Sequence, residues 1–296
     1  MSATKAEKSA REAQSNPFAN RAPEVVTITP ELASDWLARN SSNRPLREYH
    51  VNKIARQIEN DEWVFNGETI KFNTKGELID GQHRLAACIM AMKPIQSIVI
   101  YNAPDNAFET IDIGKRRSIS DALEQRGEVN TLILSSVLSL LWKYERGKLS
   151  AKGSGWYGSE NTPTTHESLT TLEKHPGVRE SIREVGRGRS KVLSAVAPLA
   201  ACHYILTHIL HDGADAEDAA EFFRQLNLGV GLEEDSPVWR LRERLIANRT
   251  ARQRLSSPEI MAITFKAWNA WRDGRSVRQL AWRGRGDVRE TFPIPE

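Results

Sequence analysis

The run Asp80-Gly81-Gln82-His83-Arg84 combines side chains that could bind a phosphate and move a proton. It follows a strand-like run and opens a short amphipathic helix, so backbone N–H groups and the helix dipole should favour an anion there. Gly81 would let the backbone approach a phosphate closely, and Arg84 could bind two phosphate oxygens. We therefore predict a phosphate site at Gly81, Gln82, His83 and Arg84, with Asp80 as a metal ligand or base.

Each of the three chemically active side chains also has a purely structural interpretation. Arg84 could form a salt bridge that holds the helix to the sheet. His83 could be a core histidine whose ring is satisfied by the backbone, and Asp80 could be a simple helix N-cap. The sequence leaves these alternatives open.

The elements around this run alternate between strands and helices. A hairpin is expected just before it, with a turn at residues 73–76, and a strand follows at residues 98–101. Earlier in the chain the apolar spacing predicts a strand at 25–28 and helices at 30–40 and 48–60. We predict a small α/β domain over residues 24–128, preceded by a polar, disordered arm over residues 1–23.

Helical periodicity dominates the second half of the chain, where strand signals are absent. The expected helices cover residues 132–144, 167–174, 178–185, 190–212, 217–228, 239–248 and 257–273. We predict an all-helical domain over residues 129–296. The fold class is therefore α+β.

The composition indicates the general class of protein and where in the cell we expect it. The chain has 296 residues, of which 40% are hydrophobic and 27% charged, as in soluble globular proteins. There is no apolar run of membrane-spanning length and no signal peptide, so we expect a cytoplasmic protein without a membrane partner. Cys88 and Cys202 are expected to be reduced and buried. Nothing indicates an oligomeric state.

Positive charge is concentrated near the end of the chain. Residues 239–290 contain thirteen Lys and Arg but only five Asp and Glu, a local excess of +8. Such a segment suits a polyanion such as DNA, and a solvated basic face is the alternative. Tryptophans interleave with these arginines and could stack on bases, although they could also be helix core. Our candidate DNA contacts here are Arg272, Arg275 and Arg283.

A second group of cations, Lys115, Arg116 and Arg117, precedes a capping-box-like helix start at Ser118. These three residues could bind DNA phosphates or the tail of a nucleotide. A charged, solvated loop is the alternative. The segment is not a Walker loop, because the required Gly-x4-Gly-Lys spacing is missing.

The order strand, helix, Asn43-Arg44-Pro45, helix, hairpin, Asp-Gly-Gln-His-Arg run, helix and strand resembles the ParB/sulfiredoxin superfamily. The run followed by Leu-Ala-Ala is typical of its phage and actinobacterial ParB-like members, and residues 112–118 and 290–293 also resemble that subgroup. The resemblance covers residues 24–128. It implies that a nucleoside triphosphate, ATP or CTP, binds at this run.

The branches of this superfamily differ in chemistry. The ParB branch is a CTP-dependent DNA clamp, the sulfiredoxin branch uses ATP and a cysteine, and a further branch resembles a free-serine kinase. Some phage members are thought to phosphorylate hydroxymethylated DNA bases. Here Gln82 stands where the sulfiredoxin cysteine would lie, and neither the Gly-Glu-Arg-Arg box nor a helix-turn-helix of the ParB branch is found. These departures favour a kinase-like use of the fold.

The resemblance also implies roles for residues outside the run. In the serine-kinase-like members an acidic residue ahead of the box is the catalytic base, and Glu68 holds that place. Arg44 lies in the loop that faces the nucleotide, so it would reach the phosphates unless it forms a loop salt bridge. Phosphoryl transfer also needs Mg²⁺, which Asp80 could bind. The predicted catalytic residues are Glu68, Asp80 and His83.

The function that we predict is a nucleotide-dependent phosphotransferase, plausibly a kinase that acts on a hydroxymethylated pyrimidine in phage DNA. The alternative is a ParB-like CTP- or ATP-dependent DNA-binding switch. A nuclease ranks third, because the acidic cluster expected for two-metal cleavage is missing. The histidines at positions 203, 208 and 211 lack a partner cluster and do not predict a metal site.

Overall fold

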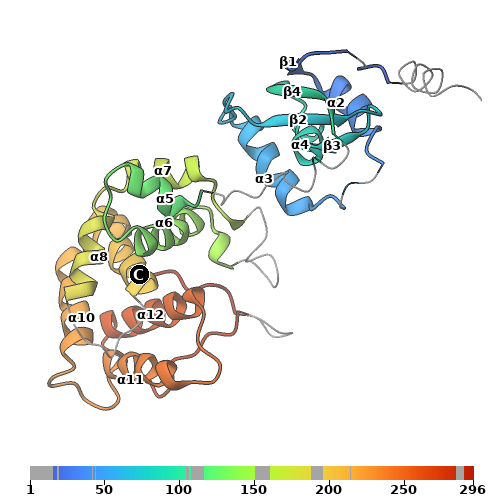
Figure 1. Ribbon diagram of the computed structural model, residues 1–296. Helices are drawn as coiled ribbons and strands as arrows, with labels where there is room; N and C mark the ends of the chain where they lie inside the picture. Colours follow the sequence, from blue (N-terminus) through green and yellow to red (C-terminus); the bar gives the residue numbers. More distant parts are fainter. Residues whose placement is uncertain are drawn as a thin grey trace, which may run out of the picture. The chain divides into compact units, whose positions relative to one another are not determined.

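The computed structural model describes residues 16–18, 20–41, 43, 45–104, 107, 117–150, 161–187, 196–213, 215–284 and 290–296. The chain forms two compact units, Met1–Arg116 and Arg117–Glu296, which we call the sheet unit and the helical unit (Figure 1). The predicted α+β class is confirmed. Among the described residues, no helix is long and apolar enough to cross a membrane.

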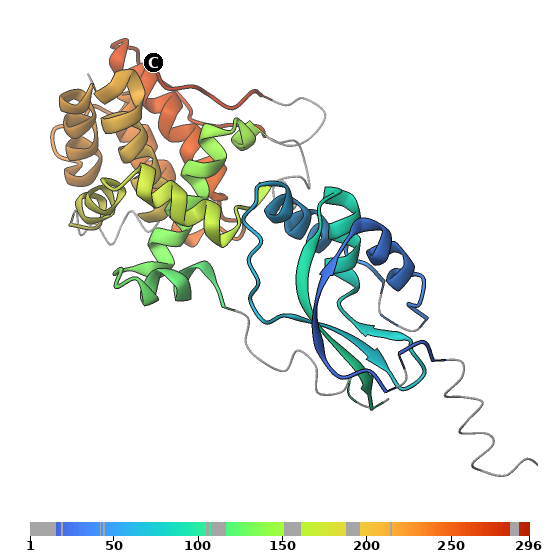
Figure 2. The same cartoon turned by 90° about the horizontal axis from the view of Figure 1, so that it is seen from above.

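The sheet unit contains a mixed four-stranded sheet with the order β1-β4-β2-β3 (Figure 2). β4 lies between β1, to which it is antiparallel, and β2, to which it is parallel. β2 and β3 form an antiparallel hairpin that carries the predicted phosphate site at its end. The strands are β1 (Glu24–Ile28), β2 (Thr69–Asn73), β3 (Leu78–Asp80) and β4 (Ile95–Ala103).

Three helices and one face of the sheet share a core. Alternate residues of β4, among them Ile95, Val99 and Tyr101, are buried because successive strand side chains point to opposite faces. They join one cluster with side chains from α2 (Pro30–Leu37), α3 (Glu48–Glu59) and α4 (Gln82–Ala91). α4 packs on both α2 and α3. α4, which begins within the Asp-Gly-Gln-His-Arg run, is therefore held by α2, by α3 and by the shared core.

Phe18 departs from the predicted disordered arm. Its side chain is buried in the core of the sheet unit, where its ring centroid lies 4.5 Å from that of Phe72 and 5.0 Å from that of Tyr101. Asn102 donates a hydrogen bond to the Phe18 carbonyl, which ties this segment to the end of β4. The arm was predicted to be disordered from the polar composition of residues 1–23. A composition gives little weight to one aromatic side chain, although the ring of Phe18 is large enough to anchor its segment in the core.

The helical unit has no strand among its described residues. Its centre is α6, which packs on α5, α7, α8 and α9, and which is almost entirely apolar on the buried side. The helices are α5 (Ile119–Gln125), α6 (Thr131–Glu145), α7 (Thr165–Lys174), α8 (Val178–Arg187), α9 (Val196–Tyr204), α10 (Ala216–Leu228), α11 (Pro237–Thr250) and α12 (Ser257–Arg272). Since α5 packs on α6 and α7, it belongs to this unit, and the division falls before the predicted boundary at residue 128.

The helix expected over residues 190–212 is interrupted. α9 passes into a π-helical segment, Ile205–Ile209, and then into a 3₁₀ turn, Leu210–Gly213. The Thr207 hydroxyl donates to the His203 carbonyl at 2.7 Å and thereby competes with the regular backbone pattern. The apolar periodicity alone gave no sign of this change.

Candidate functional site

Asp80 and Lys71 face each other across the β2–β3 hairpin. The strand register pairs these two residues directly, so both side chains emerge on the same face of the sheet. Lys71 Nζ lies 2.7 Å from Asp80 Oδ2, and both side chains are about four-fifths buried. Asp80 is thus already neutralised by a strand neighbour before any ligand binds.

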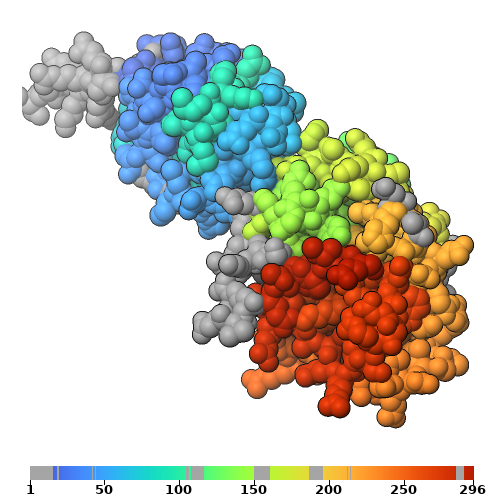
Figure 3. Space-filling model, turned by 180° about the vertical axis from the view of Figure 1, so that it is seen from behind, coloured from blue at the N-terminus to red at the C-terminus, as the bar shows by residue number. Residues whose placement is uncertain are grey.

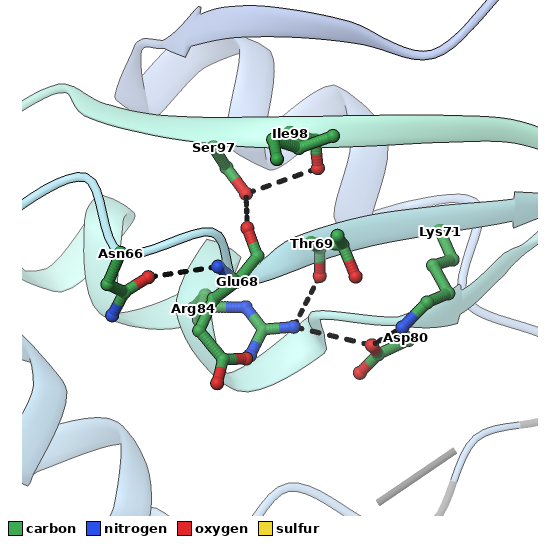
Figure 4. A network of polar contacts seen from close by, with 8 residues as sticks. All are labelled: Asn66, Glu68, Thr69, Lys71, Asp80, Arg84, Ser97 and Ile98. Atoms are coloured by element: carbon green, nitrogen blue, oxygen red, sulfur yellow. Dashed lines mark hydrogen bonds and ion pairs between the residues drawn. The ribbon is translucent and has the colours of Figure 1, made fainter. Parts of the chain in front are cut away.

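Arg84 lies between two carboxylates, as Figure 4 shows. Its Nη1 donates to Glu68 Oε2 at 2.7 Å, and its Nη2 lies 3.4 Å from Asp80 Oδ2 and also donates to the Thr69 carbonyl. Asp80 is the last residue of β3 and Arg84 lies in the first turn of α4, so this contact links the hairpin to the helix across the Gly81 N-cap. The salt-bridge interpretation of Arg84 therefore describes a contact that the structure contains.

Glu68 differs from the rest of this network in its exposure. Its side chain is 56% exposed, whereas that of Arg84 is 14% exposed. The Glu68 backbone is fixed on both sides: its N–H donates to Asn66 Oδ1 at 3.0 Å, and its carbonyl accepts from Ser97 Oγ at 2.8 Å (Figure 4). A rigid backbone thus presents a solvent-accessible carboxylate beside a mostly buried arginine.

Gly81 is the N-cap of α4 and has φ +102°, a conformation that L side chains rarely adopt. A Cβ atom placed there would lie 2.3 Å from Ile70 Cδ1 in β2. Close packing on the sheet therefore requires a glycine here. The predicted role of Gly81 in admitting a phosphate is not needed to explain its presence.

Gln82 and the loop before α3 are joined by amide side chains. The Gln82 side chain is 5% exposed and accepts a hydrogen bond from Asn40 Nδ2 at 2.9 Å. Asn43 Nδ2 donates to Asn40 Oδ1 at 2.7 Å and to the Leu78 carbonyl at 2.6 Å. This arrangement fixes Asn43 against the end of the hairpin and the start of α4. Any phosphate contact at position 82 would come from the backbone rather than from this buried amide.

His83 connects α4 to the start of α3. Its Nε2 accepts a hydrogen bond from the Arg47 backbone N–H at 3.1 Å, so Nε2 carries no proton in this arrangement. The ring lies edge-on to His50, with 5.8 Å between centroids. The ring of His83 is thus satisfied by a backbone group, as its structural interpretation expected, and this group is the Arg47 N–H. To donate a proton to a phosphate, His83 would use Nδ1.

The four charges of Glu68, Lys71, Asp80 and Arg84 sum to zero, and they alternate in sign. A phosphate that reached Arg84 would compete with Glu68, the only exposed carboxylate of this group. Its displacement would leave a free carboxylate next to the bound phosphate. This exchange is the chemistry that the arrangement offers most directly.

The site fits Mg²⁺ only as an ion carried by a nucleotide. Asp80 offers a single carboxylate, and Lys71 and Arg84 already contact its Oδ2 atom. In the part of the chain that the structure describes, no group of three or more His, Cys, Asp or Glu could hold a metal ion. Mg²⁺ commonly binds through one or two carboxylates together with substrate phosphates, and Asp80 could serve only in that way.

The other predicted contacts are distributed over the chain. Arg44, Lys115 and Arg116 lie outside the described residues, and Arg117 is exposed just before α5. The guanidinium of Arg272 donates to Asp215 at 2.6 Å and to Asp218 at 2.9 Å, and it holds the pKa of Asp215 below its usual range.

The remaining two candidate DNA contacts differ from each other. Arg275 pairs with Asp273 at 2.6 Å, so its charge is matched within the chain. Arg283 is exposed and forms no ion pair with a described residue. Arg272 and Arg275 are thus neutralised internally, and Arg283 is not.

Both cysteines are free and buried, as expected. Burial raises the pKa of Cys88 to about 11, so its thiol is protonated at neutral pH. Its Sγ donates to the Ile28 and Lys93 carbonyls at 3.4 and 3.2 Å. Cysteine chemistry at this site therefore has no support in the geometry.

Lys71 and Ser97 were missed in the sequence. A regular hairpin with the turn at residues 73–76 would pair Lys71 with Ile79, but a bulge between Lys71 and Phe72 shifts its partner to Asp80. Ser97 reaches Glu68 only because β4 lies beside β2, and the two strands are far apart in sequence. Because the bulge sets this register, the sequence contained no local signal for the pairing of Lys71 with Asp80.

Comparisons with models of known protein families, with curated proteins and with solved structures gave no match.

Proposed function

We propose that this chain is a nucleotide-dependent phosphotransferase whose site is formed by Glu68, Asp80, His83 and Arg84. The acceptor in this proposal is a hydroxyl group, plausibly that of a hydroxymethylated pyrimidine in DNA. The observation that carries the proposal is the placement of Arg84 between an exposed and a mostly buried carboxylate. The resemblance of the Asp-Gly-Gln-His-Arg run to the ParB/sulfiredoxin superfamily supports it.

The roles follow from charge and exposure. Phosphoryl transfer relies on neutralising the phosphate oxygens and on orienting or deprotonating the acceptor. Arg84 would bind the transferred phosphate through its two terminal nitrogens. Glu68, released from Arg84, would accept the proton of the attacking hydroxyl. ATP or CTP would bring Mg²⁺ with it, and Asp80 would orient the ion.

One observation favours the alternative, a nucleotide-dependent DNA-binding switch. Lys71 and Arg84 both contact Asp80 Oδ2, so this oxygen is less accessible to a metal ion than that of a free carboxylate. A site that binds the triphosphate through Arg84 and exchanges Glu68 could change conformation without transferring a phosphoryl group. The two functions differ only in whether a phosphorylated product forms.

The test uses the full chain with γ-labelled ATP or CTP, Mg²⁺, and DNA with or without 5-hydroxymethylpyrimidines. Products are read by nucleoside mass spectrometry. We expect label on the modified base with the unaltered protein. Glu68→Gln should abolish transfer while keeping nucleotide affinity, whereas Glu59→Gln, an exposed acid on α3, should change neither.

A second variant tests the phosphate contact. A single charged hydrogen bond is worth about 1.5–3 kcal/mol, so Arg84→Gln should lower nucleotide affinity roughly 10- to 100-fold for the first bond lost and further if both are lost. Unchanged transfer in Glu68→Gln would overturn the assignment of the base. Free phosphate or no turnover, together with DNA affinity that depends on nucleotide, would replace the kinase by the switch.

A further inference from the structure

Among the described residues of the helical unit, α11 and the loop that follows it carry a group of arginines without ion-pair partners. Residues 237–254 contain six arginines and a single acidic residue, Glu243. α11 forms one side of this unit in Figure 1, and its residues reach the molecular surface in Figure 3. The structure separates the six arginines into two groups with different surroundings.

Two of the six arginines have local partners. Arg242 Nη1 donates to the Leu226 and Asn227 carbonyls at 2.6 and 3.0 Å, and so satisfies the C-terminal end of α10. Arg240 lies over the Trp239 ring and 3.4 Å from Glu243. These two side chains are explained by packing within the unit.

The other four arginines are exposed and form no ion pair with a described residue. We call them the α11 basic face: Arg244, Arg249, Arg252 and Arg254. The only polar contact that the structure gives their side chains is a long one, 3.5 Å, from Arg254 Nη2 to the Arg249 carbonyl. Their charges are therefore available to an external partner.

Other exposed arginines of the helical unit are neutralised instead. Arg224, for example, holds the pKa of Glu221 down to about 2. The paired arginines include Arg126 with Glu173, Arg183 with Glu180, Arg224 with Glu221 and Arg275 with Asp273. The lack of carboxylates around the α11 basic face is thus a local feature and not a property of the whole surface.

A helix dipole accounts for only part of this pattern. A cation in the last turn of a helix is stabilised by about 0.3–1 kcal/mol, which explains Arg249 but not four arginines together. Like charges that share a surface repel each other unless an anion compensates them. Arginine side chains bind phosphate oxygens in a bidentate manner, which makes a phosphate backbone the fitting partner.

We propose that the α11 basic face binds the phosphate backbone of double-stranded DNA. This inference names the DNA surface of the proposed function and rests on it for the choice of DNA. Arg254 Nη2 contacts the Arg249 carbonyl, so Arg249 and Arg254 lie together at the C-terminal end of α11. Arg244 lies about 7.5 Å earlier along the helix axis and about 140° around it, so it would reach a different part of the duplex backbone. Arg252 and Arg254 extend the face beyond the helix. The internally paired Arg272 and Arg275 contribute less.

The experiment measures binding of the full chain to a short fluorescein-labelled DNA duplex by anisotropy over a series of salt concentrations. The test variant replaces all four arginines of the α11 basic face by Gln. The control variant replaces four ion-paired arginines, Arg126, Arg179, Arg183 and Arg224, by Gln and so changes the net charge equally. A third variant replaces the α11 basic face by Lys and keeps its charge.

The slope of log affinity against log salt should fall by about 3–4 in the Gln variant of the α11 basic face, since each phosphate contact contributes about 0.9. The control and the Lys variant should keep most of the slope. An equal loss in test and control variants would overturn the inference, as would absence of duplex binding at low salt. Circular dichroism establishes that all variants are folded.

The outcomes also separate this inference from the proposed function. A chain that binds duplex DNA through the α11 basic face but transfers no phosphoryl group would support the inference and overturn the kinase. A chain that phosphorylates a free hydroxymethylated nucleoside, but whose duplex affinity does not depend on these arginines, would overturn the inference and support the kinase.

Discussion

Replacing Gly81 by Ala should destabilise the sheet unit strongly, for two reasons that can be separated. Gly81 has φ +102°, so any L residue there is strained. An added Cβ would also lie 2.3 Å from Ile70 Cδ1 and 3.3 Å from Ile70 Cα. The second distance matters because the backbone of β2, unlike the tip of the Ile70 side chain, cannot rotate away.

The two effects have comparable magnitudes. A residue held in a sparsely populated backbone conformation costs about 1–3 kcal/mol. Overpacking of a well-packed core costs about 1–3 kcal/mol more. We therefore expect Gly81→Ala to lower the free energy of unfolding by about 2–6 kcal/mol, a large part of the stability of an ordinary domain.

Gly67→Ala is the matched control. Gly67 has φ +81°, but a Cβ there would meet nothing within 4 Å, so only the backbone strain applies. Ile70→Val removes the Cδ1 atom and costs about 0.5–1.5 kcal/mol alone. In the Gly81→Ala background it should instead recover about 1 kcal/mol or more, a coupling that a double-mutant cycle detects.

The assay is urea denaturation of the full chain, followed by hydrogen–deuterium exchange of peptides from residues 69–92. These peptides report the sheet unit alone, which tryptophan fluorescence of the whole chain would not. If Gly81→Ala and Gly67→Ala were equally destabilising, the close approach to Ile70 would not be the reason for a glycine. Strictly additive effects of Gly81→Ala and Ile70→Val would refute the reasoning in the same way.

Two further predictions concern the helical unit. Thr164 is fully buried and caps α7 by accepting from the Glu167 N–H at 3.0 Å, so Thr164→Ala should cost about 1–2 kcal/mol in urea denaturation; an equal loss in Thr164→Ser would contradict the cap. Burial lowers the pKa of His203 from 6.5 to about 4, so the unfolded chain binds the proton more readily and stability should fall as pH drops from 6.5 to 4. His203→Asn should reduce that fall by on the order of 2–3 kcal/mol, and an unchanged pH profile would exclude His203 as its cause.

Local patterns were sufficient for most of the secondary structure. The helix start with a capping box at Ser118 before α5 was predicted closely, because such a cap depends on neighbours in sequence. The π-helical segment after α9 was not predictable in this way, since hydroxyl-to-carbonyl competition leaves the apolar periodicity unchanged. Phe18 was missed because one buried ring has little weight in a polar composition.

The candidate site shows where local reasoning ends. Asp80 and Arg84 were both singled out because they belong to one short run of the chain, although their contact with each other was not predicted. Lys71 depends on a strand register that a bulge shifts by one residue, and Ser97 depends on a parallel neighbour from a later part of the chain. Contacts of this kind require the tertiary structure.

The packing of the sheet unit accounts for most of the residues that first indicated a phosphate site. Gly81 is required by Ile70, Gln82 is held by Asn40, and His83 accepts from the Arg47 backbone. These positions would be constrained even in a protein without a ligand.

Glu68 is the exception, and it is therefore the most informative residue of the site. Its side chain is more than half exposed, so solvent screens its ion pair with Arg84 although the Arg84 side chain is mostly buried. Packing thus gives little reason for a carboxylate at this position. The proposed role as a proton acceptor beside Arg84 would explain it. A large functional loss in Glu68→Gln with nearly unchanged stability is the result that a structural role cannot produce.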